Sequence, residues 1–255
     1  MSIRSDLNSF LDFCGELFRF NSRFFAYGFK PPYEFQEFIK QCYLIGYKSL
    51  PLIGLTAFIM GVVLTMQLRP SMADYGVESQ LPAIVAIAIV REVGPVITAL
   101  IFAGKIGSSI GAELGSMKVT EQIDAMEVSG TNPFMYLVVT RVLACTFMLP
   151  ILVMLGDAIS LYGAYLGVNL HSTTSFNLFW SQVFDNLVFG DVLPAFIKSF
   201  FFGFAVGLIG SYKGYTSNKG TEGVGRSANS AVVVSSVMIF IIDLLAVQVT
   251  NIWGI

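Results

Sequence analysis

The sequence is short of charged residues. Asp, Glu, Lys and Arg make up 13% of the 255 residues, whereas about 25% is usual in soluble proteins. Hydrophobic residues account for 55%, and the mean hydropathy is +0.71. So few charged residues cannot cover the surface of a soluble domain. The composition therefore excludes a cytosolic enzyme and predicts a membrane-embedded protein. The net charge of −2, without a cluster of Lys and Arg, argues against nucleic acid as a partner.

Cysteine and histidine are equally scarce. Cys14, Cys42 and Cys145 form neither a CxxC pair nor a disulfide framework, and the single histidine, His171, is far from them in sequence. We therefore expect no redox chemistry and no metal centre. The nucleotide-binding pattern GxxxxGK(S/T) is also missing, since Gly104-Lys105 is followed by isoleucine. The chain is predicted to be no ATPase itself and to carry no cofactor.

Residues 1–48 carry apolar side chains at helical spacing, with charged residues on the opposite face. Pro31 and Pro32 break this pattern, and a second stripe continues to Lys48. We interpret the segment as amphipathic helices lying on a membrane surface; the alternative is packing on a soluble partner. The apolar stripes comprise Leu7, Phe10, Leu11, Cys14, Leu17, Phe18, Phe24, Phe25, Phe35, Phe38, Ile39, Cys42 and Ile45.

Five apolar stretches follow in residues 49–255, which we treat as a single domain. Each is near the roughly 20 residues that a hydrocarbon core requires. A shorter amphipathic stripe between the third and fourth stretches predicts an interfacial helix on the outer side, with Phe176, Phe179, Trp180, Val183, Phe184, Leu187 and Val188. The predicted fold is an all-α membrane protein with spans at 49–68, 81–103, 134–157, 193–212 and 231–253.

The distribution of Lys and Arg predicts the orientation, because cytoplasmic loops carry an excess of both. Six precede the first span, two lie between spans two and three, and three lie between spans four and five. Only Arg69 falls on the opposite side. The N terminus is therefore predicted in the cytoplasm, and Ile255, after an odd number of spans, outside. The cations that set this count after the first span are Lys105, Lys118, Lys213, Lys219 and Arg226.

Four charged residues lie within the predicted spans. They are Arg91, Glu92, Lys198 and Asp243. At about 1.5 Å per residue, all four fall roughly 18–21 Å from the cytoplasmic ends of their spans. Charges at such depth are costly and are expected to find partners, so a buried cluster joining spans two, four and five is predicted. Two interpretations stay open: a structural lock, or a lock that also borders a cavity and meets a lipid headgroup. Arg141 and Asp157 are predicted to snorkel from opposite ends of span three.

The connection between spans two and three contains two further patterns. Glycines at four-residue spacing line one helix face and allow another backbone to approach closely; they are Gly107, Gly111 and Gly115. Downstream, Thr120 is a plausible N-cap and Gly130 a stop for a short acidic helix. With Ile123 and Met126 exposed, such a short helix is unstable alone, so we expect it to dock on a partner. The alternative is a connector resting on its own protein.

The runs REVGPVITAL (91–100) and AELGSMKVTEQIDAMEV (112–128) closely resemble those of the MlaE permease family. The resemblance extends over nearly the whole chain, including Lys198, Gly214-Tyr215 and Asp243. Three positions depart from the commoner family residues. They are Ser116, Met126 and Ser129, where Thr, Leu and Met are more usual.

The resemblance implies the membrane subunit of an ABC transporter that moves phospholipid or a related lipid at a bacterial inner membrane. It implies a homodimer, two cytosolic ATPase subunits that bind the ATP, and a periplasmic oligomer of MCE-domain proteins. The ATPases would grip the short helix through Glu121, Gln122, Ile123, Asp124, Met126 and Glu127. A lipid cavity would open between the two copies, with Leu64, Met66, Leu68, Met72 and Tyr75 as candidate lining residues.

Two rival classes remain. The first is a self-contained, ion-coupled secondary transporter or channel that uses the intramembrane charges as a relay. The sequence shows no internal repeat and no paired broken helices to favour it. The second is a membrane-embedded lipid enzyme, which would need a nucleophile with a base, and a single histidine does not supply that arrangement.

Overall fold

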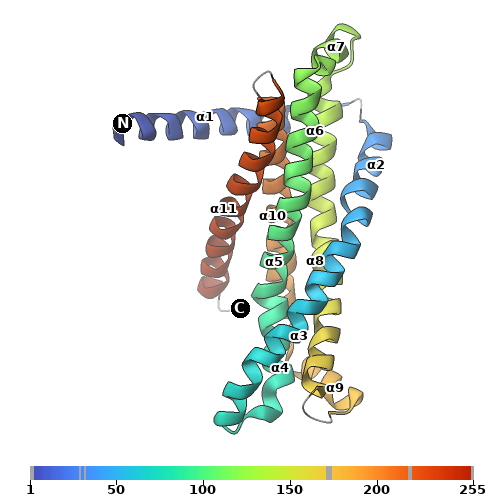
Figure 1. Cartoon of the computed structure of the whole chain (residues 1–255), viewed down its shortest axis with the longest axis vertical. Helices are drawn as coiled ribbons and strands as arrows, with labels where there is room; N and C mark the ends of the chain where they lie inside the picture. The colour runs from blue at the N-terminus through green and yellow to red at the C-terminus, as the bar shows by residue number, and fades with distance from the viewer. Residues whose placement is uncertain (1–2, 29, 32, 171–173, 218–219, 254–255) are drawn as a thin grey trace.

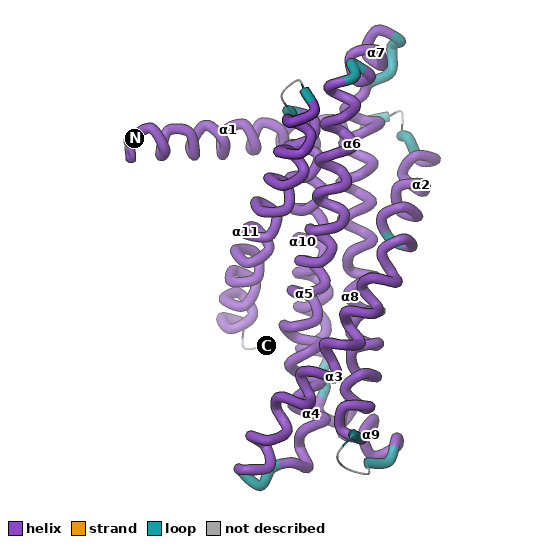
Figure 2. The backbone as a smooth tube through the Cα atoms, viewed as in Figure 1, coloured by secondary structure: helices purple, strands orange, loops and turns teal. Residues whose placement is uncertain are grey.

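The computed structural model describes residues 3–28, 30–31, 33–170, 174–217 and 220–253. Pro32, His171, Lys219 and Ile255, all used above, lie outside these residues. Within them the chain is helical apart from short connections, and no strand occurs (Figure 2). The α-helices are α1 (Ile3–Gly28), α2 (Phe35–Ile45), α3 (Leu50–Asp74), α4 (Leu81–Ala88), α5 (Gly94–Phe102), α6 (Ser108–Val119), α7 (Gln122–Val128), α8 (Thr140–Asn169), α9 (Phe176–Asn186), α10 (Phe189–Tyr215) and α11 (Thr221–Trp253).

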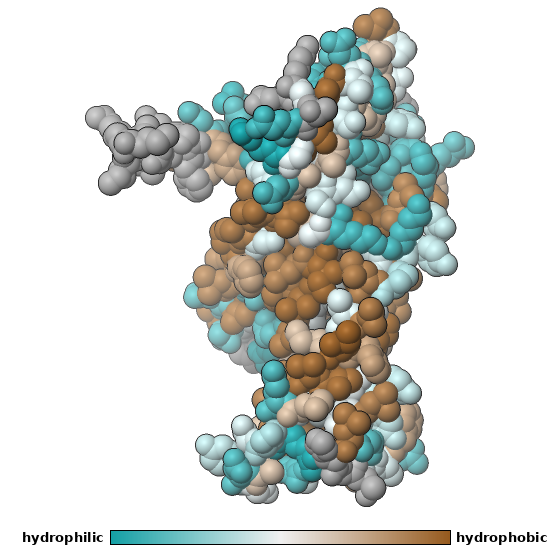
Figure 3. All heavy atoms as spheres, in the orientation of Figure 1, coloured by the Kyte–Doolittle hydropathy of each residue, from teal (hydrophilic) through white to brown (hydrophobic). Residues whose placement is uncertain are grey.

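Short 3₁₀ and π-helical turns join several of these helices into longer rods. The 3₁₀ turns are η1 (Tyr47–Ser49) and η2 (Glu78–Gln80), and the π turns are η3 (Ile89–Val93), η4 (Ala103–Gly107) and η5 (Phe134–Val139). Five rods are long and apolar enough to cross a membrane: Phe35–Asp74, Glu78–Val119, Phe134–Asn169, Phe189–Tyr215 and Glu222–Ile252. Figure 3 shows an apolar band across the middle of the molecule, between more polar ends. The predicted fold class, an all-α protein with five spans, is confirmed.

The rods form an elongated bundle in which α8 packs against both α3 and α10. The short helix α7 lies at one end of the bundle, and α9 lies at the other end together with the turn between α3 and α4 (Figure 1). Small residues allow the close packing: a Cβ atom on Gly61 would collide with the Ser160 carbonyl, and one on Gly203 with the Cys145 carbonyl. Close backbone approach of this kind is how helices associate in lipid.

Helix α1 lies roughly at right angles to the long axis of the bundle, near the end that carries α7, and its N-terminal part projects beyond the other helices (Figure 1). Its Phe20 and Phe24 side chains are buried against the bundle, whereas Phe18 is 72% exposed. The Tyr212 hydroxyl of α10 donates to Glu16 Oε2 over 2.6 Å. The amphipathic stripe therefore divides: part of it packs on the protein's own α10 and η5, and the rest remains available to a membrane surface.

The snorkelling interpretation of Arg141 and Asp157 is wrong. Both residues are buried, at 2% and 9% exposure, because the third rod continues to Asn169 and Asp157 lies well inside it. Arg141 instead donates to Glu113 Oε1 over 2.7 Å and to the Leu137 carbonyl over 2.9 Å. Both side chains are thus held inside the protein and do not reach the interface.

The glycine stripe on η4 and α6 lies against α11 and α10. A Cβ atom on Gly111 would be 3.2 Å from Ala228 Cα, and one on Gly115 would be 2.9 Å from Ser227 Oγ. The Ser227 hydroxyl donates to the Gly111 carbonyl over 3.1 Å. Towards α10, a Cβ atom on Gly107 would be 3.5 Å from Val206 Cγ1.

Replacing Gly111 with valine should lower the free energy of unfolding by about 1–3 kcal/mol, since the added methyl groups force α6 away from α11. Thermal unfolding of the detergent-purified protein measures the loss. Gly104→Val is the matched control, because a Cβ atom on Gly104 meets nothing within 4 Å. Equal melting temperatures for the two variants would show that the stripe does not set the helix spacing.

Candidate functional site

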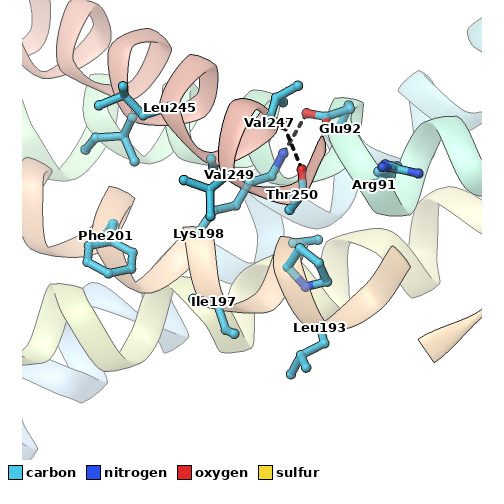
Figure 4. A pocket seen from close by; sticks show the side chains of 14 residues that line it. Arg91, Glu92, Leu193, Ile197, Lys198, Phe201, Leu245, Val247, Val249 and Thr250 are labelled. Carbon is cyan, nitrogen blue, oxygen red and sulfur yellow. Dashed lines mark hydrogen bonds and ion pairs between the residues drawn. The ribbon is translucent and has the colours of Figure 1, made fainter. Parts of the chain in front are cut away.

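Arg91 and Glu92 lie in the π-helical turn η3, in the middle of the second rod. Pro95 follows shortly afterwards and has no N–H to donate to the preceding turn. Such wide turns accommodate an interrupted helix and often occur at functional sites. This turn places two adjacent charged side chains at one depth and directs them to different neighbours (Figure 4).

Lys198 of α10 joins the second and fifth spans. Its ammonium nitrogen lies 2.6 Å from Glu92 Oε2 and 2.9 Å from Asp243 Oδ1. The lysine side chain is only 5% exposed, whereas those of Glu92 and Asp243 are 40% and 20% exposed. One buried cation is therefore shared by two carboxylates from different helices. We call these three residues the Lys198 junction.

Arg91 points away from Lys198 (Figure 4) and forms an ion pair with Asp191, in the first turn of α10. The distance from Arg91 Nη1 to Asp191 Oδ1 is 3.3 Å. Sequence reasoning missed Asp191, because it placed the start of the fourth span at residue 193. An acidic residue in the first turn of a helix was the available signal. Both members of this pair remain near enough to the surface to meet a ligand, at 38% and 14% exposure.

A cavity of about 580 Å³ opens beside these charges. Arg91, Glu92 and Lys198 border it, and α10 and α11 supply a mostly apolar wall (Figure 4). We call it the α10–α11 cavity. Its apolar lining includes Leu193, Ile197, Phe201, Ile242, Leu245 and Val249. A space with charged groups on one side and alkyl groups elsewhere suits an amphiphilic ligand.

The five residues predicted to line a lipid cavity between two copies lie elsewhere in the chain. Leu64, Leu68 and Met72 pack against the cluster of buried residues around α4 and α9. Met66 and Tyr75 are 43% and 83% exposed. None of the five borders the α10–α11 cavity. A cavity formed with a second copy stays a prediction for these residues.

The short helix α7 begins at Gln122, one residue later than a Thr120 N-cap predicts. Thr120 ends α6 and donates its hydroxyl to the Ser116 carbonyl, so it is not an N-cap. Glu121 takes a left-handed conformation at φ 58° and turns the chain between the two helices. At the far end, Gly130 has φ +80°, a conformation that suits glycine at a helix stop.

The two apolar residues of α7 are packed on the protein itself. Ile123 is only 1% exposed, and Met126 lies against the same buried cluster. The prediction that both are exposed is therefore wrong, because α7 folds back onto the end of the bundle. Asp124 accepts from Lys118 over 2.8 Å. The surface that remains for a partner consists of Glu121, Gln122, Ala125, Glu127 and Val128, which are all exposed.

Among the residues that the structure describes, no group of three or more His, Cys, Asp or Glu side chains could hold a metal ion. His171 lies outside those residues. The absence of a metal centre accordingly stays a prediction. The ionic contacts described above join side chains directly to one another.

Comparison with known proteins gives the site its context. The family model for permease MlaE matches residues 38–249, which include η3, α7, α10 and most of α11. The chain belongs to the MlaE permease family. It is 39% identical to a probable ABC transporter permease protein of Rickettsia typhi over 86% of this chain and 85% of that one. It is also 34% identical to the intermembrane phospholipid transport system permease protein MlaE of Haemophilus influenzae, over 83% and 81%.

Membership of the MlaE family makes this chain an ABC transporter permease and a multi-pass membrane protein. A probable ABC transporter permease protein of Pyropia yezoensis is 40% identical over 80% of this chain and 78% of its own. The matched region contains the Lys198 junction, the pair of Arg91 with Asp191 and the helix α7.

Proposed function

We propose that the chain moves phospholipid, or a related lipid, between a bacterial inner membrane and a periplasmic MCE-domain protein. The α10–α11 cavity is the observation that carries the proposal. Its wall matches acyl chains, and the Arg91 guanidinium at its border offers the paired N–H donors that suit a phosphate group. The name of the Haemophilus relative supports phospholipid as the cargo.

The orientation follows from the excess of Lys and Arg before the first span and after the second and fourth. We place the end with α1 and α7 in the cytoplasm, and the end with α9 in the periplasm. The N terminus is then cytoplasmic and the C terminus periplasmic. Two cytosolic ATPase subunits would bind at α7, and a ring of MCE domains would sit above α9.

A second copy of the chain completes the proposed permease. In α11, Val237, Phe240 and Leu244 are all more than half exposed, so this rod has an apolar face for lipid or for the partner copy. The candidates Met66 and Tyr75, at the α9 end of the bundle, are exposed and could line a shared lipid cavity. Closure of the ATPase pair on ATP would push α7, tilt the spans and squeeze the lipid out.

Replacing Arg91 with glutamine tests the cargo site. Losing a charge-assisted contact with phosphate should weaken phospholipid binding by about 1.4 kcal/mol, which is a factor of about ten in affinity. The purified complex should then retain correspondingly less phospholipid. Quantitative mass spectrometry of the retained lipids measures it. Arg91→Lys keeps the charge and the ion pair with Asp191 but not the forked donors, so intermediate retention is expected.

Arg226→Gln is the matched control, because its side chain is 75% exposed at the start of α11 and its ion pair with Glu222 lies on the same helix. Unchanged lipid retention in Arg91→Gln would remove the phosphate site. Lipid transport by vesicles that contain this chain alone, without nucleotide, would favour a self-contained secondary transporter instead.

A further inference from the structure

Asp157 is a carboxyl group inside the bundle that the transport proposal does not use. It is 9% exposed, and its Oδ1 atom is fully buried and has no hydrogen-bond partner among the residues that the structure describes. One turn further along α8, the Ser160 hydroxyl is also buried without a partner. An ionised carboxylate buried in this way costs several kcal/mol, so the group needs neutralising.

The positive charge that reaches Asp157 is already shared by two other carboxylates. Lys198 acts on Asp157 electrostatically, but its ammonium is hydrogen-bonded to Glu92 and Asp243. Two carboxylates already exceed the single positive charge of the Lys198 junction. Arg91, the cation on η3, is paired with Asp191. If Asp157 were ionised as well, its negative charge would have no positive charge of its own to balance it.

Among the residues that the structure describes, the side chains that face Gly156, next to Asp157, carry no charge. Around Gly156, next to Asp157, α5 presents Thr98 and α3 presents Ile53 and Ala57. A void of about 10 Å³ lies between these helices, bordered by Thr56, Gly94, Thr98 and Ser160 among others. It has room for about one water molecule. Because Asp157 is buried, solvent would screen a charge on its carboxyl group only weakly.

The Asp157 side chain lies against the backbone next to η3, the turn that carries Arg91 and Glu92. A Cβ atom on Gly94 would collide with Asp157 Oδ1, so the carboxyl group lies directly against the backbone after η3. Pro95 lacks the N–H that would satisfy a carbonyl of this turn. In a membrane span such a freed carbonyl is satisfied by a neighbouring side-chain donor or by water. A protonated carboxyl group is a donor.

We infer that Asp157 binds a proton and, as a neutral carboxylic acid, packs against the η3 turn and stabilises it. This turn carries Arg91 and Glu92. Asp157 is then a positioning residue: it touches no cargo and acts through the backbone at Gly94. The bound proton removes the third negative charge beside Lys198. The inference rests on the packing of α8 against η3 and α5 and does not depend on the identity of the cargo.

Infrared spectroscopy of the full chain in lipid nanodiscs tests this inference. Protein labelled with ¹³C-aspartate should show, at neutral pH, a label-sensitive C=O stretch of a protonated carboxylic acid. That band should vanish in Asp157→Asn, which keeps the shape and the neutrality of the group. Asp185→Asn is the matched control, because Asp185 is exposed on α9, and it should leave the band in place.

Two results would overturn the inference: a wild-type spectrum without a label-sensitive acid band, or a band that persists in Asp157→Asn. Should the asparagine variant fail to fold, Asp157→Glu gives the second measurement. With only aspartate labelled, this variant moves the acid to an unlabelled residue. The ¹³C-sensitive band should then disappear and an unlabelled acid band should replace it, whereas an unchanged labelled band would again overturn the inference.

Discussion

Replacing Lys198 with methionine is expected to destabilise the protein by about 3 kcal/mol and to abolish transport. The substitution keeps the length of the side chain but leaves Glu92 and Asp243 facing each other without their shared cation. Breaking a buried ion pair costs about 3–5 kcal/mol, and the 40% exposure of Glu92 favours the lower end. Thermal unfolding in detergent and nucleotide-driven lipid transport by the reconstituted complex measure the two effects.

Lys40→Met is the matched control, because this lysine is 63% exposed and its partner Glu37, which is buried, keeps the hydrogen bonds that it accepts from Gln41 and Tyr136. Losing a largely exposed cation of this kind is expected to cost about 0–1 kcal/mol. Exchanging the charges, with Lys198→Asp and Asp243→Lys together, should recover part of the stability that each reversal loses, since a lysine at 243 faces two acids. Equal stability of Lys198→Met and Lys40→Met would contradict the structural role of the junction.

Reversing the exposed acids of α7 is expected to uncouple ATP hydrolysis from transport. Glu121→Lys combined with Glu127→Lys changes the charge of the surface proposed to meet the ATPase, whereas Ile123 keeps α7 docked on the bundle. We expect binding of the ATPase to weaken at least tenfold, or about 1.4 kcal/mol. Co-purification of the ATPase and lipid-stimulated ATP hydrolysis measure the loss.

Glu222→Lys is the control for the α7 reversal. The Glu222 side chain is 89% exposed at the start of α11 and is not part of α7. Asp124 is a poorer choice, since it accepts from Lys118 and its reversal would disturb α7 itself. Intact assembly with full transport in the doubly reversed variant would show that α7 is only a connector resting on its own protein.

Depth in the membrane was predictable from the sequence because it depends only on counting residues along a helix. The positions of Lys198 and Asp243 at one level predict a pair, and the structure places their atoms 2.9 Å apart. The same counting could not assign Arg91. Its partner depends on how α10 begins, and Asp191 lies before the predicted start of that span. Adjacent residues on a π turn point in different directions, which no periodicity reveals.

Burial was the property that sequence patterns predicted least well. Ile123 and Met126 were expected to be exposed because a short acidic helix has no obvious core of its own, yet α7 folds onto the bundle. Asp157 was assigned to the end of a span because the third span was predicted to end at residue 157, yet the helix continues to Asn169. In both cases a contact with a distant part of the chain overrides the local pattern.

The sequence by itself determined that this protein is helical, crosses a membrane five times and carries opposite charges at one depth. These features follow from hydropathy and from the rise of a helix, which are local properties. Only the tertiary structure decided which carboxylates share Lys198, which face of α7 stays open, and that Asp157 presses on the turn beside Pro95. Such choices depend on the rotation of each helix about its axis, and packing between distant segments sets that rotation.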